Sequence, residues 1–132
     1  MLKFTYTETG FHIERLTQSL EEWVTARVIL ALRVGCPICV EPSTAAFLLP
    51  ANLPGLDLLQ TEIIREGNDA VSLCIADHEY VEVSLKGTWV AGDPATVEGV
   101  FVTNFSCTAD LLIFQLWYDS QAATSCLHEA GD

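Results

Sequence analysis

The chain has 132 residues, half of them apolar, and carries 18 acidic against 6 basic side chains, giving a net charge of −12. This composition supplies one buried core and excludes extensive disorder, which requires low hydrophobicity together with high charge density. Proteins that bind nucleic acid or anionic membranes rely on clustered Lys and Arg. Because the six basic residues are scattered between positions 3 and 86, we expect neither partner.

The N-terminal segment MLKFTYTETG has no apolar core and no small-residue cleavage site, so it does not resemble a secretory signal peptide. The longest apolar run, VILAL at residues 28–32, is far shorter than the ~20 residues of a membrane-spanning helix. Five cysteines without a signal peptide favour reduced thiols. We therefore predict one cytoplasmic domain over residues 1–132, ending in a frayed acidic tail at residues 119–132.

The first elements expected are a hairpin and a long strand. LKFTYT (2–7) and FHIERL (11–16) alternate around the break ETG, which predicts a β-hairpin. Ser19 and Glu22 then fit the capping box of a helix. However, small or apolar residues recur at every second position over residues 24–34, the period of a strand. We predict at most one helical turn near residues 19–22, followed by a strand.

Farther along, Pro42 separates two short predicted strands, and Gly67 and Asn68 end a predicted helix over about residues 56–66. Gly87 suggests a bulge within a long strand. LLIFQLWYD fits a strand or a buried helix, and its aromatic residues favour the strand. The predicted strands after residue 37 are 38–41, 45–49, 70–76, 80–92, 98–105 and 111–119. The fold class is mainly β (α+β): an antiparallel meander closed as a small barrel or sandwich with one covering helix.

The sharpest chemical motif is CPIC, which places Cys36 and Cys39 at Cys-x-x-Cys spacing. A redox motif needs its first thiol at a helix N-terminus, where free N–H groups and the helix dipole stabilise the thiolate. Glu41 and Pro42 follow, and the residue before a proline disfavours helical geometry. We therefore expect both cysteines to be small structural residues, with a thiol redox pair as the alternative.

Cys74 and His78 could complete a zinc site with Cys36 and Cys39, but these residues span about 40 positions, unlike compact zinc modules. Cys126 and His128 form another close pair. The cluster Asp77, His78 and Glu79 could act as a general base or bind a divalent ion. It also has the composition of a polar turn between strands, which we favour. We expect no cofactor and no catalytic residue.

Trp23, Ile29 and Ala31 share the second face of the predicted strand, which has no evident cover. An isologous homodimer would bury that face. The leading hypothesis is therefore a non-enzymatic domain that acts through contacts with itself or with another protein. The alternatives are a thiol redox or metal-binding protein using Cys36 and Cys39, and a barrel that binds a small apolar ligand.

Three segments carry a resemblance to a known group of proteins: KFTYTETGFH (3–12), CVEPS (39–43) and EYVEVSLKGTW (79–89). Together they resemble short, acidic, uncharacterised proteins of cyanobacteria, over most of the chain. The resemblance implies a cytoplasmic protein with no established activity, so no catalytic residue is carried over from it.

Overall fold

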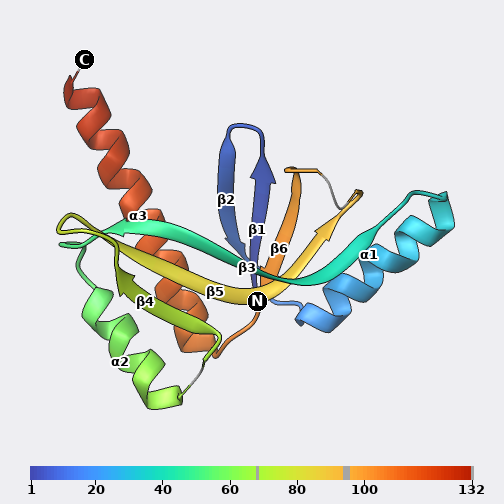
Figure 1. Ribbon diagram of the computed structural model, residues 1–132, viewed down its shortest axis with the longest axis horizontal. Helices are drawn as coiled ribbons and strands as arrows, with labels where there is room; N and C mark the ends of the chain where they lie inside the picture. The colour runs from blue at the N-terminus through green and yellow to red at the C-terminus, as the bar shows by residue number, and fades with distance from the viewer. Residues whose placement is uncertain (68, 94–95, 132) are drawn as a thin grey trace.

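The computed structural model describes residues 1–67, 69–93 and 96–131, with side chains described as far as Gln121 (Figure 1). Within these ranges the chain forms six strands and three helices. In chain order they are β1 (Leu2–Thr7), β2 (Gly10–Arg15), α1 (Leu20–Val34), β3 (Cys39–Pro50), α2 (Leu56–Glu66), β4 (Val71–Ile75), β5 (Tyr80–Ala91), β6 (Gly99–Thr103) and α3 (Cys107–Gly131).

All six strands belong to one antiparallel sheet in the order β2-β1-β6-β5-β3, with β4 also paired to β5. Strand β5 organises the sheet, because β3 pairs with it along its whole length. On the other edge of β5, β4 pairs with residues 81–85 and β6 with residues 88–90. The predicted mainly β, antiparallel fold is confirmed, and the sheet curls into a half-barrel (Figure 1).

The two faces of the sheet carry separate cores, because successive residues of a strand point to opposite sides. Phe101 packs with Phe4 in the main core, where their ring centres lie 5.5 Å apart, and helices α2 and α3 cover this face. The next residue, Val102, belongs to a second core with Trp23 of α1. Helix α1 therefore packs on the face opposite to α2 and α3 (Figure 1).

The strand predicted over residues 24–34 is wrong, since these residues lie in helix α1. The N–H of Glu22 donates to Ser19 Oγ at 3.2 Å, so the capping signal marks the true start of a full helix. Gly35 ends the helix in the left-handed conformation, with φ at 72°. The alternation of apolar residues over 24–34 gave the wrong prediction because α1 is apolar on several sides. Leu30, Leu32 and Val34 contribute to the strand-like period of two, yet all three are exposed.

Three other local predictions also differ from the structure. Strand β3 is continuous through Pro42, because β3 is an edge strand where a missing N–H is tolerated. Gly87 forms no bulge; it pairs in register with Ser43, and a Cβ there would lie 2.4 Å from the carbonyl oxygen of Val102. Residues 111–119 lie in α3, where Ile113 and Leu116 are buried at helical spacing. The helix predicted at about residues 56–66 is confirmed as α2. The predicted N-terminal hairpin is confirmed as β1 and β2.

Helix α3 also runs through residues 119–131, where the sequence predicts a frayed tail. The side chains beyond Gln121, which include Cys126 and His128, lie outside the described part of the chain. Among the helices of the described residues, none combines the length and hydropathy of a membrane span.

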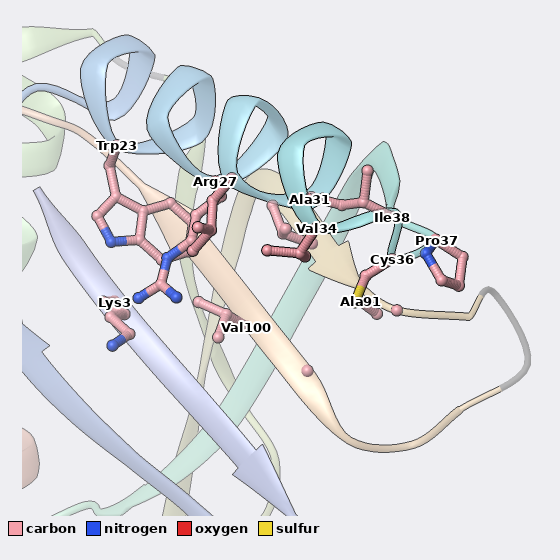
Figure 2. A pocket seen from close by; sticks show the side chains of 14 residues that line it. Lys3, Trp23, Arg27, Ala31, Val34, Cys36, Pro37, Ile38, Ala91 and Val100 are labelled. Atoms are coloured by element: carbon pink, nitrogen blue, oxygen red, sulfur yellow. The ribbon is translucent and has the colours of Figure 1, made fainter.

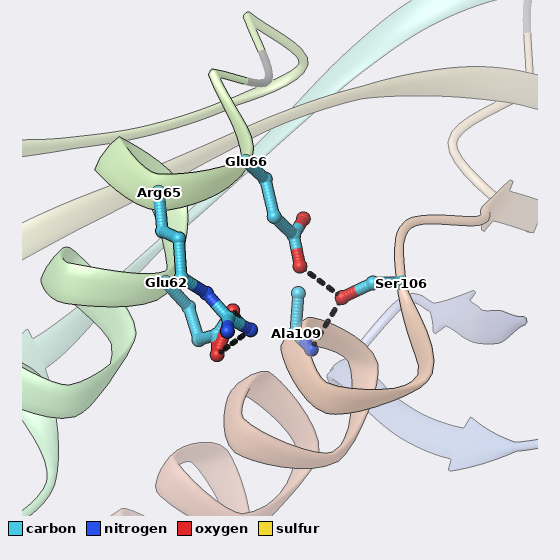
Figure 3. Close-up of polar contacts among 5 residues, drawn as sticks. All are labelled: Glu62, Arg65, Glu66, Ser106 and Ala109. Atoms are coloured by element: carbon cyan, nitrogen blue, oxygen red, sulfur yellow. Dashed lines mark hydrogen bonds and ion pairs between the residues drawn. The ribbon is translucent and has the colours of Figure 1, made fainter.

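The start of α3 is anchored to two distant parts of the chain. Ser106 Oγ accepts the N–H of Ala109 at 3.0 Å and donates to the carboxylate of Glu66 at the end of α2 (Figure 3). One turn later, Asp110 Oδ2 lies 3.5 Å from the buried α-ammonium of Met1, and Asp110 Oδ1 accepts the N–H of Phe105. Burial raises the pKa of Asp110 above its ordinary value of 3.8, although the ammonium and the Phe105 N–H oppose that rise.

We predict that Ser106→Ala lowers the free energy of unfolding by about 1 kcal/mol, because it removes a helix cap together with the bond to Glu66. Urea unfolding followed by circular dichroism measures this loss. Thr108→Ala, exposed in the same first turn, is the matched control and should not destabilise the protein. Equal stability of the Ser106 variant and the wild type would contradict the anchoring role.

A second prediction concerns pH. Because the pKa of Asp110 is raised, the folded protein holds this proton more tightly than the unfolded chain does. The stability contributed by this proton is fully present below the ordinary pKa and is lost as pH rises through the raised value. Relative to Asp110→Asn, the wild type should therefore lose free energy of unfolding in urea titrations as pH rises from below the ordinary pKa of 3.8 through the raised value. A wild type that gains stability over the variant in this window would contradict the assignment.

Candidate functional site

Helix α1 is anchored to the sheet through few side chains. Trp23, 5% exposed, packs against the second core, and Ala31, 9% exposed, faces the sheet two turns later. An open groove of about 510 Å³ lies between α1 and the sheet. The short segment after α1 closes one end of this groove with Cys36, Pro37 and Ile38 (Figure 2). Because Ala31 is small where Trp23 is large, it cannot fill the space beneath the second half of the helix.

One end of the groove is cationic. The Arg27 guanidinium carbon lies 4.9 Å from the ring centre of Trp23, and Lys3 Nζ lies 5.9 Å from the same centre (Figure 2). Such cation–π contacts hold a cation in place at an aromatic face. Lys3 Nζ also lies 3.9 Å from Glu14 Oε1, at the outer limit of an ion pair. None of the described residues that line the groove is acidic.

The outer face of α1 points away from the sheet and carries a second feature. Glu22, Ala26, Ile29 and Arg33 are all exposed and recur at intervals of four, three and four residues, which places them in one line along the helix. We call these four residues the α1 stripe. Leu32 lies beside the stripe and is 74% exposed, while Ile29 within it is 45% exposed. No described part of the chain covers these two side chains.

The three predicted interface residues do not share a face. On a helix, Trp23 and Ala31 are two turns apart and both point to the sheet, where they are buried. Ile29 points outward instead. The strand interpretation grouped them because it placed all odd positions on one side.

Cys36 and Cys39, the alternative redox pair, lie after the C-terminal end of a helix. Cys36 follows the C-terminus of α1, where its N–H donates to the carbonyl of Ala31 at 2.9 Å, and Cys39 begins β3. A helix C-terminus carries partial negative charge and disfavours an anion, whereas redox motifs use the N-terminus. Cys36 is exposed at the groove, and both cysteines are free.

The candidate metal ligands Cys36, Cys39, Cys74 and His78 come from separate elements. Cys74 is exposed on β4 and His78 lies in the turn between β4 and β5, whereas Cys36 follows α1 and Cys39 begins β3. Among the described residues, no group of three or more His, Cys, Asp or Glu side chains is placed to hold a metal ion.

The acid–histidine cluster forms a surface turn. Asp77 Oδ1 accepts the backbone N–H groups of Glu79 at 2.7 Å and Tyr80 at 2.9 Å, which is the pattern of an Asx-turn. His78 Nε2 lies 3.6 Å from Glu79 Oε1, and both side chains are exposed. The Asp77 carboxylate therefore stabilises the turn by accepting these two backbone hydrogen bonds.

Lys3 and Arg27 are the groove residues that sequence reasoning missed. The spacing of Trp23 and Arg27, one helical turn apart, was the available signal. This spacing places Arg27 beside Trp23 only if residues 20–34 form a helix, whereas the sequence pattern predicts a strand there.

Comparison with curated proteins returned no match, and comparison with solved structures returned none either. A family model described as Alr0857-like matches residues 1–121. This match confirms the resemblance to a group of uncharacterised proteins and brings no activity with it. Since the match spans most of the sequence and nearly all of the described elements, the chain belongs to the Alr0857-like family.

Proposed function

We propose that this protein is a non-enzymatic domain that acts through protein contacts, and that it forms a homodimer through the α1 stripe. The observation that carries the proposal is the exposed, self-complementary order of Glu22, Ala26, Ile29 and Arg33 on the outer face of α1.

The stripe matches itself when two α1 helices pair antiparallel about a two-fold axis. Glu22 and Arg33 lie equally far from the midpoint of the stripe, as do Ala26 and Ile29. In such a pair Glu22 of one copy faces Arg33 of the other, and the small Ala26 receives Ile29. An isologous interface requires this kind of reciprocal matching. The 3–4 spacing is also the one by which paired helices interlock.

Charge also favours a second copy at this surface. Two chains with a net charge of −12 repel each other over most orientations. Helix α1 carries Glu21 and Glu22 against Arg27 and Arg33, so it is locally neutral. Contact through α1 brings the copies together at a surface without net charge and removes Ile29 and Leu32 from water.

The same proposal includes a cytoplasmic location. Its support is that Cys36, Cys39, Cys74 and Cys107 are all free thiols and three of them are exposed, which is typical of a reducing compartment. A non-enzymatic role is supported by the exposed Asp77 turn, whose carboxylate is engaged by backbone N–H groups.

Substitution of the central stripe residue tests the interface. We expect the wild type to sediment as a dimer that dissociates on dilution, and Ile29→Glu to weaken association at least about tenfold, because it buries a charge at the contact. Ile64→Glu places the same charge on an exposed isoleucine of α2 and should leave the dimer intact. A wild type that stays monomeric over the concentration range, or equal effects of the two substitutions, would overturn the interface.

Reversal of the charges tests the antiparallel register. Glu22→Arg and Arg33→Glu each place like charges opposite one another across the proposed axis and should weaken the dimer. The double variant restores opposite charges and should recover dimerisation, although both changes oppose the helix dipole and cost some helix stability. Sedimentation of the three variants measures the coupling. A double variant as weak as the sum of the single variants would exclude this pairing.

A further inference from the structure

We propose that the groove beneath α1 binds a small amphipathic anion, a single carboxylate or similar group attached to an apolar body. This inference concerns the sheet-facing side of α1, so it does not depend on dimerisation through the outer stripe.

The groove has the size and lining of a ligand site. Its volume of about 510 Å³ falls within the range of small-molecule pockets. Its apolar surface includes side chains from four separate parts of the chain: Ala31 on α1, Ile38 after it, Val90 on β5 and Val100 on β6. An apolar ligand body seated here would be removed from water on both sides, which is the main source of favourable binding free energy.

The charge at the groove specifies an anion. Two of the six basic residues of this acidic chain, Lys3 and Arg27, lie at one end of it. Arg27 has no ion-pair partner among the described residues, and Trp23 holds its guanidinium against a buried ring. Both side chains keep hydrogen-bond donors available for an incoming carboxylate, for which the planar guanidinium is well shaped.

The same charges limit the ligand to one anionic group. A net charge of −12 penalises each negative charge that approaches, and screening reduces this penalty beyond about 8 Å at physiological salt. Arg27, together with Lys3, whose ammonium lies 3.9 Å from Glu14 Oε1, offsets a single negative group, whereas a polyanion such as nucleic acid would extend over acidic surface. The apolar lining then selects an anion with a hydrophobic body over a free inorganic ion.

Calorimetric titration with decanoate, below its micelle concentration, tests the proposal. We expect saturable binding at one site per chain and at least about tenfold weaker binding of decanol, which has the same tail without the charge. Arg27→Gln and Lys3→Gln should each weaken decanoate several-fold and leave decanol unchanged. Lys86→Gln removes the same charge from the exposed face of β5 and is the matched control.

A second measurement on the wild-type protein locates the site without any substitution. Cys36 lines the groove, whereas Cys74 and Cys107 are exposed on β4 and α3. Decanoate should slow alkylation of Cys36 by iodoacetamide and leave Cys74 and Cys107 unchanged, as measured by peptide mass spectrometry. Absence of saturable binding, equal affinity for decanol, or equal protection of all three cysteines would overturn the proposal.

Discussion

The packing of Trp23 against the outer face of the sheet is the interaction on which both candidate surfaces depend. It is the one large side chain of α1 that is buried, and it joins the helix to Val90 and Val102 of the central strands. Its ring also positions Lys3 and Arg27. Because Trp23 fixes α1 near the helix N-terminus, the apolar second half extends over a groove on one side and presents the stripe on the other.

Local signals predicted a good part of the fold. The alternation of residues 2–7 and 11–16, the glycine after α2 and the clean pattern of β5 depend on neighbours in the chain, and each gave the right element. Helix α1 was missed for a different reason: Leu30, Leu32 and Val34 are apolar without being buried, so the hydrophobic period could not distinguish a helix from a strand. For residues 111–119, which lie in α3, both a strand and a buried helix were open, and the preference of aromatic residues for strands favoured the wrong one. The continuity of β3 through Pro42 depends on its pairing with β5, which no local pattern encodes.

The candidate site was predictable to a smaller extent. Ile29 is exposed, but Trp23 and Ala31, which the sequence placed on the same face, point to the sheet. Lys3 reaches the groove only because β1 lies between β2 and β6 in the sheet, which is a consequence of topology. Cys36, the residue with the strongest sequence signal, contributes to the groove as a lining residue after a helix C-terminus. The Cys-x-x-Cys motif therefore marked a part of the groove, but the chemistry of Cys36 depends on its position after the C-terminus of helix α1.

We propose that the outer face of α1 packs against itself in a second copy. Isotope-filtered nuclear Overhauser spectroscopy on a mixture of labelled and unlabelled chains tests it directly, because it detects only contacts between copies. We expect a contact between the methyl groups of Ala26 in one copy and Ile29 in the other. A dimer whose intermolecular contacts arise from another surface, or a sample without intermolecular contacts at high concentration, would contradict pairing through α1.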